Sequence, residues 1–146
     1  MSKLSIEALS VKKALEEIRA KKRLLESIKR QMDEARYSIG ITAIDYGKPS
    51  IKGGIKVSAQ ERYAILMDKL EHRYYEIAEE IFTAENTLTT EMCVLTPAEQ
   101  AILTDRFING YSWNKIQSQY YYAERQPFRI CNRAIEKLAK IKDGSK

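Results

Sequence analysis

Residues 95–140 of the chain read LTPAEQAILTDRFINGYSWNKIQSQYYYAERQPFRICNRAIEKLAK. Thr96-Pro97-Ala98-Glu99 is a capping box with proline at the first helical position, where a missing amide costs nothing, so a helix is predicted to begin there. Asn109-Gly110 is typical of a left-handed helix end. Ser112 is a good cap for a second helix, and Tyr121-Tyr122-Ala123 predicts a turn before a third. Three helices with such short connections predict a helix-turn-helix unit.

The last of these helices carries its basic residues on one face. They recur at four-residue steps, as Arg125, Arg129, Arg133 and Lys137. Ile130, Ala134 and Leu138 fall on the opposite face. Arginines near the start of such a helix can reach guanine edges in the major groove, whereas later basic residues lie nearer the phosphates. The alternative is an amphipathic helix whose basic face is simply solvated. The predicted DNA-binding residues are Arg125, Gln126, Arg129, Arg133, Lys137 and Lys140.

Two heptad patterns precede this region, one on each side of a glycine-rich segment. The first predicts a helix over residues 1–37, and the second predicts a helix that begins at Ser58, which forms a capping box with Glu61. Residues 38–57 contain four glycines and a proline, so a long loop is predicted there. The first stripe comprises Val11, Ala14, Ile18, Leu25, Ile28, Met32 and Ala35, and the second comprises Tyr63, Met67, Leu70, Tyr74, Ile77, Ile81, Ala84 and Leu88.

Opposite charges favour the pairing of these two helices. Residues 1–37 hold ten basic and six acidic residues, a net charge of +4, whereas residues 58–94 hold three and eight, a net charge of −5. Two solvated faces that merely differ in charge remain an alternative, because single surface pairs contribute little. The sequence therefore predicts an all-α protein, with a coiled-coil-like helical hairpin at 1–92 and a helix-turn-helix domain at 93–146. We expect a homo-oligomer, because a two-helix hairpin with narrow seams leaves apolar edges uncovered.

The composition excludes several kinds of site. The net charge of +5 fits a polyanionic partner, although charge alone decides little. Cys93, Cys131 and His72 are too few and too far apart for a zinc site, and two such thiols are typical of a reduced, cytoplasmic protein. No apolar run approaches the roughly 18 residues that span a membrane. Without a phosphate-binding glycine loop or a nucleophile constellation, we expect no cofactor, no metal and no enzymatic activity.

The C-terminal region also resembles a known family. Residues 95–100 (LTPAEQ), 107–116 (FINGYSWNKI), 124–126 (ERQ) and 133–138 (RAIEKL) are similar to region 4 of the sigma-70 family. The closer likeness is to RinA/ArpU-like phage regulators, which place such a domain after a helical N-terminal half. The resemblance implies a sequence-specific regulator of late genes of a phage or prophage, acting on double-stranded DNA in the cytoplasm of a Gram-positive host. RNA polymerase is a further partner that the resemblance allows.

The chain departs from the family pattern at two positions. Ala123 stands where the family has a serine that caps the recognition helix, and Pro127 stands where it has a β-branched residue. Regular helix should therefore begin late, with Gln126 before it and Pro127 at its first position. Two other functions stay open, a DNA-packaging subunit like a small terminase and a helical scaffold. The small terminase subunits, however, usually carry their DNA-binding part first.

Overall fold

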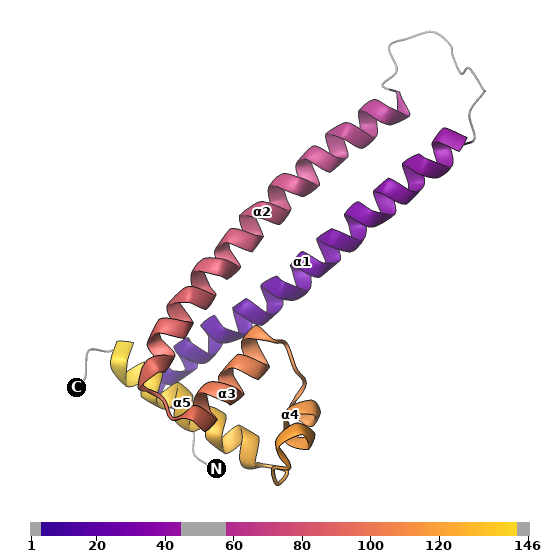
Figure 1. Cartoon of the computed structure of the whole chain (residues 1–146). Helices are drawn as coiled ribbons and strands as arrows, with labels where there is room; N and C mark the ends of the chain where they lie inside the picture. Colours follow the sequence, from indigo (N-terminus) through magenta and orange to yellow (C-terminus); the bar gives the residue numbers. More distant parts are fainter. Residues whose placement is uncertain (1–3, 45–57, 143–146) are drawn as a thin grey trace. The chain divides into compact units, whose positions relative to one another are not determined.

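Every regular element that the structure describes is helical. The computed structural model of the chain describes residues 4–44 and 58–142. The elements are α1 (Ile6–Ile44), α2 (Ala59–Glu91), a 3₁₀ turn η1 (Met92–Val94), α3 (Pro97–Leu103), a π-helical turn η2 (Thr104–Ile108), α4 (Trp113–Tyr120) and α5 (Gln126–Lys142) (Figure 1). The prediction of an all-α protein is confirmed for this part of the chain. Within the same residues, no helix combines the length and the apolar character needed to cross a membrane.

Helix α1 is longer than the sequence predicts. It ends at Ile44 rather than near residue 37, so it includes the first third of the predicted 38–57 loop. A single glycine inside a helix costs only about 1 kcal/mol relative to alanine, and Gly40 is therefore tolerated where the pattern suggested a helix end. The rest of the predicted loop, 45–57, lies outside the described residues. Helix α2 begins as predicted, where the Glu61 amide donates to the Ser58 hydroxyl at 3.1 Å.

The chain divides into two compact units, and α1 and α2 contribute to both. One unit takes Met1–Lys21 together with Ile81–Lys146, and the other takes Lys22–Glu80. The boundary predicted between residues 92 and 93 lies inside the first unit. The start of α1 and the end of α2 therefore belong with the C-terminal helices.

The unit Lys22–Glu80 has a narrow apolar seam formed by segments of α1 and α2 that lie side by side (Figure 1). Among the residues of this unit whose burial is described, 22–38 and 58–80, all the buried ones belong to the predicted heptad stripes, and the remaining stripe members are half-buried. The buried residues are Ile28, Met32, Met67, Leu70 and Ile77. The heptad pattern thus identified the buried positions of this unit correctly.

The other unit has a larger core, in which the first half of α1 packs with the C-terminal helices. One stripe assignment in α1 needs correction, because Ala14 is exposed whereas Leu15 is buried. Both positions continue the three-four alternation, and burial of the larger leucine side chain stabilises the fold more. The buried apolar residues of this core are Ala8, Val11, Leu15, Ile18, Leu88, Met92, Leu95, Ile102, Leu103, Phe107, Ile116, Ile130, Cys131, Ala134, Ile135, Leu138 and Ala139.

The caps and turns predicted for residues 95–126 are present. The Thr96 amide donates to Glu99 Oε1 at 3.0 Å and the Glu99 amide donates back to Thr96 Oγ1 at 3.3 Å, so the capping box is complete. Gly110 ends η2 with φ = +76°, and Tyr121 ends α4 with φ = +56°. Helix α5 begins at Gln126, one residue earlier than predicted.

Leu15→Ala should lower the free energy of unfolding by about 2–5 kcal/mol, because it removes a side chain that is 3% exposed in a shared core. Leu9→Ala is a matched control on the same helix, where the side chain is 53% exposed, and should change it by no more than about 0.5 kcal/mol. Urea unfolding followed by circular dichroism measures both. Equal losses in the two variants would contradict the packing of α1 in this core.

Candidate nucleic-acid interface

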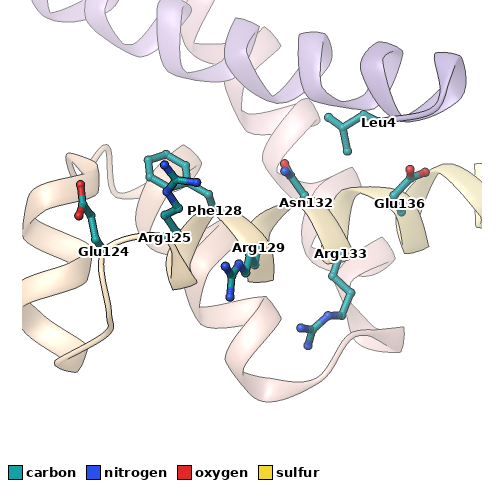
Figure 2. A pocket seen from close by; sticks show the side chains of 8 residues that line it. All are labelled: Leu4, Glu124, Arg125, Phe128, Arg129, Asn132, Arg133 and Glu136. Atoms are coloured by element: carbon teal, nitrogen blue, oxygen red, sulfur yellow. The ribbon is translucent and has the colours of Figure 1, made fainter. Parts of the chain in front are cut away.

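Helix α5 separates its basic and apolar side chains as the sequence predicts. Arg125, just before the helix, and Arg129 and Arg133 within it are exposed. The opposite face buries its apolar side chains, among them Ile130, Ala134 and Leu138. In Figure 2, Arg129 and Arg133 project from the same side of the helix. The face that carries the arginines is therefore free of any packing role in the core.

The three arginines share a concave surface. One hollow is lined by eight residues: Arg125, Arg129, Arg133, Glu124, Glu136, Asn132, Phe128 and Leu4 (Figure 2). A second hollow is lined by Gln126, by Glu124 and by the same three arginines, with Ala123 and Ile130. Within α5, five basic residues stand against one acidic residue, Glu136. The lining of the first hollow holds three arginines against two glutamates, so it carries a small net positive charge, and Leu4 and Phe128 add apolar surface.

Gln126 has a local structural bond in addition to its predicted contact with DNA. Its Oε1 accepts a hydrogen bond from the Ala123 amide at 3.4 Å. The alanine at this position has no hydroxyl to cap the helix, but the glutamine side chain returns to the turn as the second half of a capping box would. The Gln126 side chain is exposed, and its NH₂ group stays outside this bond.

Lys137, also predicted to contact DNA, forms an ion pair inside the unit. Its Nζ lies 2.9 Å from Oε1 of Glu99, whose side chain is 1% exposed. Burial alone would raise the pKa of Glu99, but the Thr96 amide and the Lys137 ammonium outweigh it and hold the pKa below its usual value. The pair connects α5 to the start of α3. Lys140, about one turn later in α5, is exposed.

A second buried carboxylate positions α4. Asp105 lies in the π-helical turn and accepts hydrogen bonds from the Tyr120 hydroxyl and from Asn109 Nδ2, the latter at 3.0 Å. The bond to Asp105, together with burial, raises the pKa of Tyr120 to about 12. Because Tyr120 is the last residue of α4, this contact fixes the point where the chain turns toward α5.

The N-terminal part of the chain, through Ser5 and the first half of α1, forms hydrogen bonds with both the η2 region and α5. Arg19 Nε donates to the Arg106 carbonyl at 3.1 Å and its Nη2 donates to the Gly110 carbonyl at 3.4 Å, which satisfies the end of η2. Near the start of α1, the Ser5 hydroxyl donates to Glu136 Oε1 at 2.8 Å and the Ser5 amide donates to Oε2 at 3.2 Å. These contacts were not predicted, because no local sequence pattern relates residues that lie so far apart in the chain.

A tilted pair of aromatic rings, which was not predicted from the sequence, packs at the start of α5. The Phe128 and Trp113 rings are 4.6 Å apart between centroids, and the Arg106 guanidinium lies 4.5 Å from the centre of the Trp113 ring. Trp113 is half-buried against the core. A sequence signal existed, since Phe128 is a large apolar residue beside the basic stripe rather than on the core face.

Neither the cysteines nor the acidic residues build a site among the residues described. Cys93 is exposed and Cys131 is buried, and both are free thiols. Burial raises the pKa of Cys131 to about 12, so this thiol stays protonated. Over 4–44 and 58–142 there is no group of three or more His, Cys, Asp or Glu residues arranged to hold a metal ion.

Comparisons of the chain with protein-family models, with curated proteins and with solved structures find no match.

Lys137→Met should lower the free energy of unfolding at pH 7 by about 1–2 kcal/mol, because the buried Glu99 carboxylate loses its partner. The loss is smaller than for a fully buried pair, since the Lys137 side chain is partly in solvent. Denaturant unfolding at several pH values measures it, with Lys140→Met as the exposed control on the same helix.

The stabilisation that the Glu99–Lys137 ion pair contributes should depend on pH. A lowered folded-state pKa means that ionised Glu99 contributes stability above its unfolded pKa, near 4.5, and that the contribution disappears as the pH falls through the folded value. The difference between wild type and Lys137→Met should therefore be largest at neutral pH and shrink in acid. A difference that does not change with pH would rule out the ion pair as its cause.

Proposed function

We propose that this protein binds double-stranded DNA in a sequence-specific manner, with α5 as the recognition helix of a helix-turn-helix formed by α4 and α5. The observation that carries the proposal is the exposed row formed by Arg125, Arg129 and Arg133, which lines a concave surface whose opposite side is core. An arginine-lined helix of this kind fits the major groove, where arginine bonds to guanine O6 and N7.

The proposed roles follow the order of residues along α5. Arg125 and Arg129 lie at the start of the helix and contact base edges, and Arg133, one turn later, contacts a base or the adjacent phosphate. Lys140 contacts phosphate. The Gln126 Oε1 bonds to the Ala123 amide, so we propose that the Gln126 NH₂ group donates to the DNA. Lys137 was also predicted to contact DNA, but it pairs with Glu99 and holds α5 to α3, so we propose this structural role for it instead.

The biological role rests on the resemblance to sigma-70 region 4 and to RinA/ArpU-like phage regulators. We propose a transcriptional regulator of phage or prophage late genes in the bacterial cytoplasm, one that helps RNA polymerase to engage a promoter. We also propose a homo-oligomer, with α1 and α2 as its interface. The exposed apolar residues Ile65, Leu66 and Tyr75 on α2 support that interface. Catalysis is not part of the proposal.

The full chain should bind duplex DNA with an affinity that falls steeply as salt rises, because bound arginine and lysine side chains release counterions from phosphates. The double variant Arg133→Gln/Lys140→Gln should reduce the slope of log Kd against log salt by about one to two. Fluorescence anisotropy with labelled duplexes at several salt concentrations measures the slope.

The matched control for that measurement is Arg23→Gln/Arg30→Gln, which removes the same charge from exposed positions of α1. It should leave the slope unchanged. If both double variants reduce binding equally, net charge alone attracts the DNA. If wild type does not bind at low salt, the helical scaffold becomes the better function.

Arg129→Ala should reduce affinity for the best site by about 1–3 kcal/mol and relax sequence preference, because it removes a base contact. Lys140→Ala should instead weaken specific and scrambled duplexes equally. The preferred DNA site is first identified by selecting the genomic fragments that the wild-type protein retains. Promoter fragments would support a role in regulation, and packaging-site fragments would support a terminase-like role. Competition binding then compares the variants, and the reverse pattern would mean that α5 enters the groove in another orientation.

A further inference from the structure

Phe128 is an exposed aromatic ring on the basic surface. It lies in the first turn of α5 with 44% of the residue accessible to solvent. It lines the same hollow as Arg125, Arg129 and Arg133 (Figure 2). The core positions of this turn are filled by its neighbours Pro127 and Ile130, both of which are buried. Phe128 is therefore not required to complete the core at this end of the helix.

The ring is also held in place. It packs at 4.6 Å, centroid to centroid, against Trp113, the first residue of α4. On Trp113 lies the guanidinium of Arg106, 4.5 Å from the ring centre, and the Arg106 Nη1 donates to the Tyr111 carbonyl at 3.1 Å. Aromatic pairs of this kind stabilise beyond the area they bury, and a cation over a tryptophan adds to them. One part of the Phe128 ring is thus anchored while the other stays open to the hollow.

A fixed apolar group beside arginines supplies a contact that the arginines cannot make. The edge of a thymine in the major groove differs from the other bases by its 5-methyl group, which proteins read by apolar contact, with phenylalanine among the residues used. We propose that Phe128 contacts the 5-methyl group of a thymine next to the base pair that Arg129 contacts. This inference rests on the proposed binding of DNA by α5. The preferred site then contains a thymine beside the guanine that the arginine reads.

Deoxyuridine tests this contact, because it differs from thymidine only by the missing 5-methyl group. In the selected duplex, each thymine is replaced in turn by uracil, and binding to the full-length protein is measured at one salt concentration. Wild type should lose about fourfold in affinity at one or two adjacent positions, as expected for one buried methyl group, and nothing at the others. Phe128→Ala should bind the thymine and uracil duplexes equally well at those positions.

Two further variants separate the contact from the fold. Phe128→Leu keeps an apolar side chain and should retain part of the thymine preference. Ile141→Ala removes an exposed apolar residue from the far end of the same helix and should retain the preference in full. Circular dichroism and unfolding free energies establish that each variant is folded. If Phe128→Ala unfolds, the test is the thymine-over-uracil preference of Phe128→Leu. A preference equal to that of wild type would overturn the inference.

The outcomes also distinguish this inference from the proposed function. If wild type binds its selected site but no uracil substitution weakens binding, Phe128 does not read a methyl group, while the DNA-binding proposal stands. If Phe128→Ala discriminates uracil as wild type does, another residue makes the contact and the inference is wrong. If no duplex binds at low salt, the proposed function itself fails.

Discussion

The shared core between the first half of α1 and the C-terminal helices is the constraint on which the proposed DNA-binding surface depends. Helices α3 and α4 have seven and eight residues. Isolated helices of that length are not stable in water, so they require tertiary packing. Ala8 on α1, Ile116 on α4 and Ile135 on α5 are fully buried in one cluster. The exposed face of α5 is therefore held in place by residues more than a hundred positions earlier in the chain.

Two buried carboxylates give this core its directional contacts. Hydrophobic burial is not directional, whereas a buried carboxylate without hydrogen-bond partners costs several kcal/mol and tolerates few arrangements. Glu99 requires Thr96 and Lys137, which sets the distance between α3 and α5. Asp105 requires Tyr120, which sets where α4 ends. Each helix of the proposed helix-turn-helix is thus connected to residues 96–108 by a polar contact as well as by packing.

What the sequence could predict depended on distance along the chain. Capping boxes, glycine ends and the two faces of α5 are patterns within a few residues, and the structure contains them. The partner of Lys137 is 38 residues away and that of Ser5 is 131 residues away, and no periodicity links them. Ala14 and Leu15 are adjacent, and both fit the three-four alternation. Which of the two is buried depends on the helices that pack against α1, and the heptad pattern does not contain that information. Phe128 was not predicted, because the DNA-binding residues were chosen by the four-residue spacing of the basic side chains. Phe128 lies beside that stripe and does not follow its spacing.

The bonds from Ser5 to Glu136 have a consequence for how the protein is made. A ribosome delivers the chain from its N-terminus, so the first turn of α1 exists long before its partner on α5 has been synthesised. Until residue 136 emerges, Ala8, Val11 and Leu15 lack the part of their shared core that α5 contributes. Contacts of such long sequence separation form late and slow the overall folding reaction. The proposed DNA-binding face is therefore completed only after residue 136 has been synthesised, and a protein truncated before α5 would expose part of this apolar stripe to chaperones and proteases.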